Sequence, residues 1–341
     1  MKETLTSEMV VMFVFSVAAF FLAMLLTPIY THFAYKYKFW KKQKSVAVTG
    51  EKLTVMNKLH ASKIARHLPT MAGVVAVTAI AIVTFVLNFD RAQTWLPLAA
   101  LLGGSIVGLL DDIINVFGES HGVGGLRSSV KFTLITAIGV ALGWFFFVKL
   151  GYDSVFVPFL GDLHFGWAII AIFAFIVVAT SNAVNISDGL DGLSGGLLMA
   201  SFGSYAMIAM LQGNYGIAGF CFTIIGALLA YTWFNIYPAR FMMGDVGSFA
   251  FGTALGVVAM LTNTLFLLPI IGLLFVVEAG SSLLQIVSKK FFHKKVFISA
   301  PLHHHLEAQG WPETKVTMRF WVIAAVLAAL GIGIALAGGV V

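Results

Sequence analysis

The sequence has 341 residues, of which 59% are hydrophobic and only 11% charged, and its mean hydropathy is +0.94. Soluble domains contain about 45–50% apolar and about 25% charged residues, so the composition excludes a soluble fold, a disordered chain, a disulfide scaffold, a collagen-like fibre and a free-standing nucleic-acid binder. The net charge of +6 is typical of a membrane protein with cationic cytoplasmic loops. We therefore expect an all-α, polytopic integral membrane protein that forms a single domain over residues 1–341.

A membrane-spanning helix needs about 20 predominantly apolar residues, and the chain contains ten segments of this kind. The first is long and begins with acidic rather than basic residues, so we interpret it as a retained helix and not as a signal peptide. The single cysteine, Cys221, lies in an apolar run and is expected to be a small buried hydrophobe. The ten predicted helices cover residues 9–32, 70–89, 94–111, 130–150, 166–186, 193–211, 215–234, 247–262, 264–287 and 319–340.

The basic residues are sorted between the two sides of the predicted bundle. Ten spans place successive loops on alternate sides, and 18 of the 21 Lys and Arg residues fall on one side. Positive charge marks the cytoplasmic side, so both termini are expected on the extracytoplasmic side. The predicted cytoplasmic loops are 33–69, 112–129 with the start of the fourth helix, 187–192, 235–246 and 288–319.

Five aspartates in three short motifs map to the predicted cytoplasmic edge, together with a histidine triplet. Acidic residues at a membrane edge are costly and indicate function. Asp111 and Asp112 are expected to end the third helix in GLLDD. The others are Asp188 and Asp191 in SNAVNISDGLDGLSGG, Asp245 in MGDVGS, and His303, His304 and His305 in PLHHHLEAQGW.

These residue types favour phosphoryl transfer that involves a lipid. Clustered carboxylates require a cation, and oxygen ligands without thiolates favour Mg²⁺ or Mn²⁺. A Mg²⁺ ion held by one or two carboxylates completes its coordination shell with substrate phosphates. Simpler interpretations stay open: Asp245 as a helix cap, and Asp188 with Asp191 as a turn. Glu278, inside the ninth segment, is expected to be a buried, paired structural acid.

The motifs GLLDD, NAVNISDGLDGL, NIYPARFMMGDVGS and PLHHHLEAQGW resemble those of the polyprenyl-phosphate N-acetylhexosamine-1-phosphate transferases over nearly the whole chain. Three histidines followed by Glu and Gly-Trp resemble the phospho-N-acetylmuramoyl-pentapeptide transferase branch. The resemblance implies transfer of phospho-MurNAc-pentapeptide from UDP to undecaprenyl phosphate, which gives lipid I and UMP and needs Mg²⁺. It also implies a bacterial inner-membrane enzyme whose active site faces the cytoplasm, and a homodimer is a plausible assembly.

The same resemblance implies roles for individual residues. The implied catalytic residues are Asp111 and Asp112 (base or nucleophile), Asp245 (metal ligand), His303 and His304. The implied substrate-binding residues are Thr70, Lys131, Asn182, Asn185, Asp188, Asp191, Asn235 and His305. One stretch, KIARHLPTMAGV, departs from the family pattern: Leu68 and Ala72 replace a threonine and a glycine, and Lys63 lies further upstream than the family's lysine.

Three other functions remain open on the sequence. A sibling enzyme would transfer N-acetylglucosamine-1-phosphate to the same lipid. A transporter would carry acids deep in several helices, whereas only Glu278 is clearly mid-span. An inactive scaffold would have no need of the full set of acids.

Overall fold

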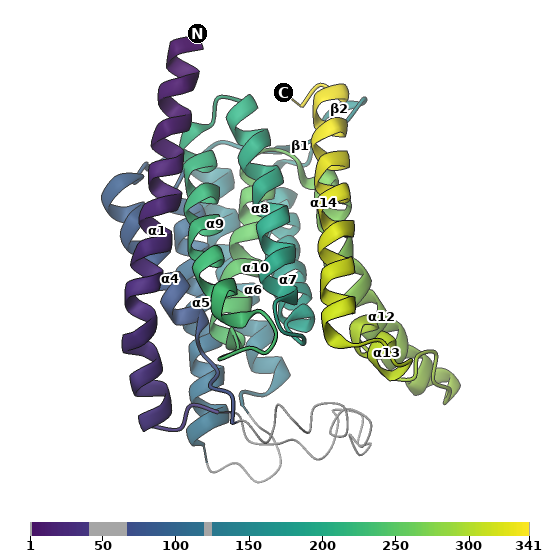
Figure 1. Ribbon diagram of the computed structural model, residues 1–341. Coiled ribbons are helices and arrows are strands. Elements are labelled where there is room, and N and C mark those ends of the chain that lie inside the picture. Colours follow the sequence, from purple (N-terminus) through teal and green to yellow (C-terminus); the bar gives the residue numbers. More distant parts are fainter. Residues whose placement is uncertain (1, 41–66, 119–124, 341) are drawn as a thin grey trace.

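The computed structural model describes residues 2–40, 67–118 and 125–340, which fold into a bundle of helices (Figure 1). Within these residues, eight helices are long and apolar enough to cross a membrane, or nine if one bent pair is a single span. The predicted all-α, multi-pass architecture is confirmed. The helices are α1 (Lys2–Lys36), α4 (Gly73–Leu87), α5 (Trp95–Phe117), α6 (Ser128–Val148), α7 (Ile169–Ser187), α8 (Leu193–Leu211), α9 (Tyr215–Asn235), α10 (Gly244–Leu261), α11 (Leu268–Ile271), α12 (Leu273–Phe292), α13 (Leu302–Ala308) and α14 (Glu313–Ala337), with short 3-10 turns η1 (Gly166–Ala168) and η2 (Leu265–Leu267).

The centre of the bundle is α10, whose residues are all buried. It packs against α5 and α7, while α1 packs on α9, α9 on α8, and α8 on α14. The approach of α5 to α10 requires glycine, because a Cβ atom on Gly108 would lie 2.0 Å from the carbonyl oxygen of Asp245. This contact fixes the start of α10 against the middle of α5.

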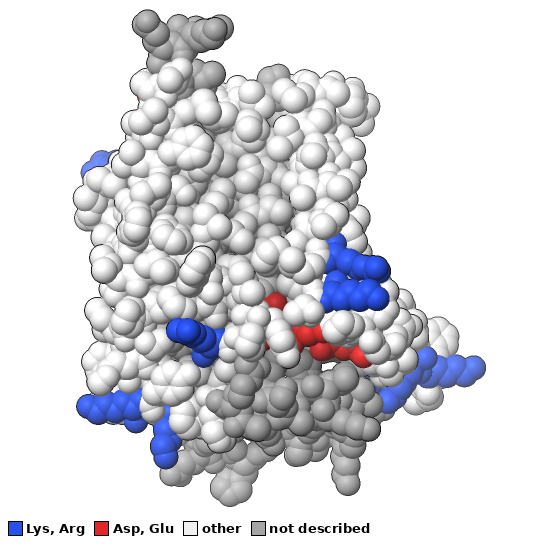
Figure 2. All heavy atoms as spheres, viewed as in Figure 1, with Lys and Arg blue, Asp and Glu red and all other residues white. Residues whose placement is uncertain are grey.

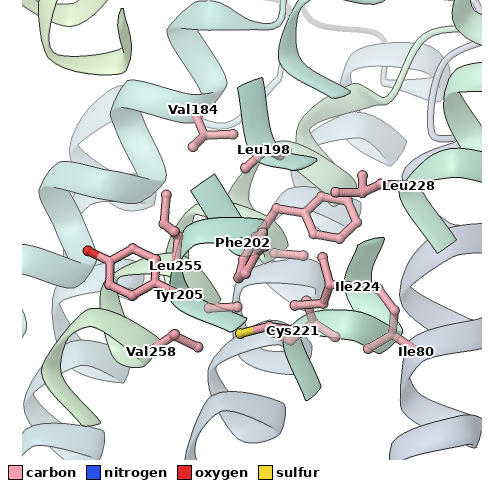
Figure 3. Close-up of a cluster of buried hydrophobic side chains, with 14 of the residues drawn as sticks. Ile80, Val184, Leu198, Phe202, Tyr205, Cys221, Ile224, Leu228, Leu255 and Val258 are labelled. Carbon is pink, nitrogen blue, oxygen red and sulfur yellow. The ribbon is translucent and has the colours of Figure 1, made fainter. Parts of the chain in front are cut away.

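A core of large apolar side chains fills the space between α8, α9 and α10 (Figure 3). Phe202 and Tyr205 of α8 and Cys221 and Ile224 of α9 belong to this cluster, and all four side chains are fully buried. Truncating a buried aromatic side chain of this kind costs about 3–5 kcal/mol. The expected burial of Cys221 is confirmed.

The outer surface of the bundle is apolar. Phe21 is 60% exposed and Leu25 70% exposed on α1, and Val326 is 63% exposed on α14. Soluble proteins rarely expose contiguous apolar surface on this scale. Such a surface is stable in the hydrocarbon core of a bilayer, where the backbone polar groups are satisfied within the helices.

The ninth predicted segment is not one helix. The pair Leu265–Ile271 and Leu273–Phe292 is bent by 79°, so the expectation of a continuous helix over 264–287 was wrong. The reason is local: Pro269 lies in the first turn of α11, and Gly272 ends this short helix, with the Gly272 N–H bonded to the Leu268 carbonyl at 2.8 Å. As a result, α12 leaves the bundle and carries α13 beside it (Figure 1).

The third predicted helix is longer than expected. Asp111 and Asp112 do not end α5, which continues to Phe117, because apolar residues such as Ile113 and Val116 extend the helix beyond the acids. Asp245 is not the cap of α10 either: the cap position is Met243, and Asp245 lies in the first turn.

The two ends of the chain lie at the same end of the bundle (Figure 1). An antiparallel hairpin of β1 (Ser154–Val157) and β2 (Gly161–His164) lies at that end as well, with Val155 opposite Leu163. The acidic motifs lie toward the opposite end, which is consistent with the alternation of loops expected from the sequence.

Candidate active site

The clearest polar cluster joins Asp111, Lys131 and Asp245, and we call it the acid–lysine cluster. The Lys131 Nζ lies 3.2 Å from Asp111 Oδ2 and 3.5 Å from Asp245 Oδ2. The side chains of Asp111, Asp245 and Lys131 are 2%, 12% and 23% exposed. Asp111 Oδ1 also accepts a hydrogen bond from the backbone N–H of Leu126 at 2.5 Å. Residues from α5, α6 and α10 thus meet around the Lys131 side chain.

Asp112 lies beside this cluster and anchors the start of α10. Its Oδ2 accepts the backbone N–H of Val246 at 3.0 Å, which satisfies a donor that the first turn of a helix leaves open. A Cβ on Gly244 would lie 2.5 Å from Asp112 Oδ2 and 2.9 Å from Thr70 Oγ1. Thr70 and Asp112 therefore approach the same side of Gly244, next to Asp245.

A short backbone ladder holds the stretch before α4 against the stretch before α10. Tyr30 adds a hydrogen bond from its hydroxyl group to the Thr70 carbonyl. This stretch includes Ala72, where the sequence departs from the family pattern, while Lys63 lies outside the described residues. The ladder bonds are Met242 N–H to Pro69 O at 2.8 Å, Ala72 N–H to Met242 O at 3.1 Å and Gly73 N–H to Met243 O at 2.8 Å.

The loop between α7 and α8, residues 188–192, carries two of the acids and is called here the acidic loop. Asn185, just before it, donates through Nδ2 to Ser248 Oγ at 2.8 Å, one turn after Asp245 on α10. Asp188 Oδ1 accepts a hydrogen bond from Ser194 Oγ at 2.6 Å. The acidic loop is therefore fastened next to the acid–lysine cluster.

Asp191 and Asn235 are buried and bind backbone. Asp191 Oδ2 accepts the Ala239 N–H at 2.9 Å. Asn235 accepts the Gly192 N–H at 2.9 Å and donates to the Phe241 carbonyl at 2.8 Å. These contacts join the acidic loop to the segment that leads into α10. Both side chains therefore fix the position of the acidic loop relative to α10.

His303 on α13 is fully buried between α12 and the acidic loop. Its Nδ1 lies 2.8 Å from Glu278 Oε2, and its backbone N–H bonds to Glu278 Oε1 at 3.1 Å. A Cβ on Gly189 would lie 2.2 Å from His303 Nε2, so the imidazole contacts the backbone of the acidic loop. The His304 ring packs edge-on against the His303 ring, with 4.1 Å between the ring centroids. The His304 Nδ1 lies 2.8 Å from Glu307 Oε2.

Asn182 and His305 make hydrogen bonds within their own segments. The exposed Asn182 donates to the Val178 carbonyl at 2.8 Å. His305 Nδ1 accepts the Ile298 N–H at 3.2 Å, and its Nε2 lies 3.1 Å from Gln309. None of these hydrogen bonds connects Asn182 or His305 to the acid–lysine cluster.

Glu278, which the sequence predicts to be a buried and paired structural acid, lies next to the acidic loop through its contact with His303. The expectation that it is buried and paired is confirmed, because it is 0% exposed and bonds to His303. The signal in the sequence was a single acid inside an apolar segment. Its partner could not be named, because His303 is 25 residues away.

The charged side chains are unevenly spread over the surface. In Figure 2 the visible acidic atoms form one group in the lower part of this face, and most visible Lys and Arg side chains lie in the same lower half. Cations on the surface around the site attract anionic ligands as these approach from solution.

The donor set fits a magnesium ion. Among residues 2–40, 67–118 and 125–340, no group of three or more His, Cys, Asp or Glu side chains could hold a metal alone. Mg²⁺ does not need one, because it is usually held by one or two carboxylates with substrate phosphates and water. The Asp245 carboxylate, with Asp111 as its neighbour across Lys131, supplies oxygen donors of the required kind.

Comparison with known proteins gives consistent matches. Residues 94–263 match the family described as "Glycosyl transferase family 4". A phospho-N-acetylmuramoyl-pentapeptide-transferase of Chloroflexus aggregans (strain MD-66 / DSM 9485) is 35% identical, over 99% of this chain and 93% of the relative. Proteins of the same name from Geobacillus sp. (strain WCH70) and Anoxybacillus flavithermus (strain DSM 21510 / WK1) are each 36% identical, and cover 93% and 96% of this chain and 95% and 98% of themselves.

Proposed function

The chain belongs to the phospho-N-acetylmuramoyl-pentapeptide-transferase family, and we propose that it transfers phospho-MurNAc-pentapeptide from UDP to undecaprenyl phosphate. The products are lipid I and UMP, and the reaction is a step of peptidoglycan synthesis. Transfer of N-acetylglucosamine-1-phosphate is not favoured, because these relatives all carry the name of the muramoyl-pentapeptide enzyme.

The observation that supports this proposal is the acid–lysine cluster. A reaction between two phosphates needs a cation to stabilise charge on the transferring phosphoryl group and carboxylates to hold metal or accept a proton. Lys131 lies within 3.5 Å of two acids from separate helices. An ammonium group in this position binds phosphate as a point charge.

The reaction is an in-line displacement at the β-phosphorus of the UDP-sugar. An oxygen of the lipid phosphate forms a bond to this phosphorus, and the bond to the oxygen bridging to UMP breaks. Asp111 faces the reacting groups beside Lys131 and accepts the proton if the lipid phosphate arrives protonated. Asp112 holds Asp245 in place through the Val246 amide. In the two-step alternative, Asp111 or Asp112 attacks the β-phosphorus and displaces UMP, and an oxygen of the lipid phosphate then displaces the aspartate.

The remaining residues bind and orient the substrates. Asp245 would hold Mg²⁺, which when bound neutralises the pyrophosphate and makes UMP a better leaving group. Asn185 and the acidic loop lie beside Asp245 and are placed to bind the nucleotide. His303 contacts the acidic loop at Gly189 with His304 packed against it, so the histidines support the loop that binds the nucleotide.

The location follows from the membrane architecture. The protein is a multi-pass membrane protein, and we place it in the bacterial inner membrane with the acid–lysine cluster facing the cytoplasm, where UDP-sugars are made. The excess of Lys and Arg in the loops of that side supports this orientation. The lipid phosphate must then enter from the bilayer.

The test is release of UMP by the purified protein in detergent or nanodiscs. We expect release only when UDP-MurNAc-pentapeptide, undecaprenyl phosphate and Mg²⁺ are all present, with a lipid-linked product of matching stoichiometry. UDP-N-acetylglucosamine serves as the competing substrate. Faster release from that sugar would overturn the substrate assignment, and full activity in EDTA would overturn the magnesium assignment.

A further inference from the structure

One face of α12 carries a stripe of buried polar side chains that holds the chain before and within α13. The stripe consists of residues spaced three or four apart, which share one face of a helix. Gln285 accepts the N–H groups of Val296 and Phe297, each at 3.0 Å, and Ser281 accepts the N–H of Leu302 at 3.0 Å. The stripe comprises Glu278, Ser281, Gln285 and Ser288.

Glu278 differs from the rest of the stripe because it binds an imidazole as well as backbone. Its Oε1 accepts the His303 N–H at 3.1 Å, and its Oε2 lies 2.8 Å from His303 Nδ1. Both residues are 0% exposed. A buried carboxylate in this arrangement needs both donors, since an unsatisfied buried charge is strongly destabilising.

The contact determines which nitrogen of the ring carries a proton. A carboxylate has acceptors only, so Nδ1 must be the donor toward Oε2. The protonation of one ring nitrogen is fixed by the hydrogen bond that nitrogen makes, and it determines what the other can do. Here the other nitrogen, Nε2, is held against Gly189 of the acidic loop.

We propose that Glu278 is a positioning residue for catalysis: it keeps Nδ1 of His303 protonated, turns Nε2 to the acidic loop, and stabilises positive charge on the ring. This inference rests on the proposed function, in which the acidic loop contacted by His303 binds the nucleotide. A positively charged ring behind the acidic loop attracts phosphate groups at that loop more strongly than a neutral ring does. The arrangement is similar in logic to an acid that orients a histidine in hydrolases.

The substitution Glu278→Gln separates this role from simple packing. Glutamine has the same shape but only one acceptor oxygen. The His303 backbone N–H can only donate and requires that oxygen, so the amide NH₂ faces Nδ1. The ring then accepts at Nδ1, its proton moves to Nε2, and the positive form loses its counter-charge.

The experiment combines kinetics with ¹⁵N-histidine NMR of the full-length protein in nanodiscs. Comparison with His303→Gln identifies the His303 signals. We expect a protonated Nδ1 in the wild type, an unprotonated Nδ1 in Glu278→Gln, and about a 100-fold lower kcat. Because His303→Gln removes the ring that Glu278 orients, the double variant should be no slower than the slower single variant.

Two further variants provide the controls. Ser281→Ala removes the neighbouring anchor of the same stripe, and we expect kcat within about threefold of wild type and an unchanged His303 spectrum. Glu278→Asp keeps the charge, so Nδ1 should stay protonated and kcat should exceed that of Glu278→Gln. This variant also tests the inference if Glu278→Gln does not fold.

The outcomes are distinct. A protonated Nδ1 in Glu278→Gln, an equal loss of kcat in Ser281→Ala, or wild-type turnover by His303→Gln would each overturn the inference while leaving the transferase activity intact. Absence of lipid I synthesis by the wild-type protein would instead overturn the proposed function.

Discussion

Replacing Lys131 by Met removes the cation between Asp111 and Asp245 and should nearly abolish transfer. The two contacts, at 3.2 and 3.5 Å, each correspond to a gross attraction of about 5 kcal/mol at an effective dielectric constant of about 20. Desolvation offsets much of this, and breaking a buried pair costs about 3–5 kcal/mol. Because Lys131 is 23% exposed, we take the lower end, about 3 kcal/mol.

This energy corresponds to a decrease in kcat/KM of about 100-fold if it is lost from the transition state. The assay is UMP release at saturating undecaprenyl phosphate, with thermal unfolding measured in parallel. Stability should also fall, since two buried carboxylates are left side by side. The double variant Lys131→Met with Asp111→Asn should regain stability, because one carboxylate is neutralised, and should stay inactive.

Lys149→Met is the matched control. Lys149 follows the opposite end of α6 and lies 5.9 Å from the Trp144 ring, so its loss should change kcat/KM by less than twofold. The reasoning is refuted if Lys131→Met keeps more than a third of wild-type activity, or if the double variant recovers both stability and turnover.

Gly189→Ala puts a methyl group 2.2 Å from His303 Nε2 and should lower kcat at least tenfold and also lower the unfolding temperature, because the buried ring must shift; unaltered kcat would show that the ring can move without consequence. Asn235→Ala leaves the buried Gly192 N–H and Phe241 carbonyl without their partner and should lower the free energy of unfolding by about 2–4 kcal/mol, measured by denaturant titration; a change below 0.5 kcal/mol would contradict the assignment. Asp245→Asn should abolish transfer in a protein that still folds, and near-normal turnover would remove Asp245 from the metal site.

The helices were predictable because composition sets them. All ten apolar segments contain a helix, since a bilayer forces the backbone to satisfy its own hydrogen bonds. Composition could not reveal the 79° bend at Gly272, because the residues on both sides are equally apolar. It also ended the third helix too early: Asp111 and Asp112 interrupt the apolar run but not the hydrogen bonding of α5.

The site was predictable as a set of residues and not as a set of contacts. Charge placement and motif resemblance gave the acids, Lys131 and the histidines. The pairing of Lys131 with Asp111 spans 20 residues and its pairing with Asp245 spans 114, distances over which local patterns carry no information. For the same reason the sequence did not reveal that Asp191 and Asn235 bind backbone groups.

The anchoring of the acidic loop by α14 has a consequence for how the protein is made. Glu313 accepts the Asp191 N–H, Thr317 donates to the Asp191 carbonyl, and Trp321 donates to the Gly192 carbonyl. These anchors leave the ribosome after every other part of the site. A chain arrested before α14 is made therefore carries its acids and Lys131 but lacks these three anchors of the acidic loop. The full set of contacts around the acidic loop is therefore completed late in biogenesis.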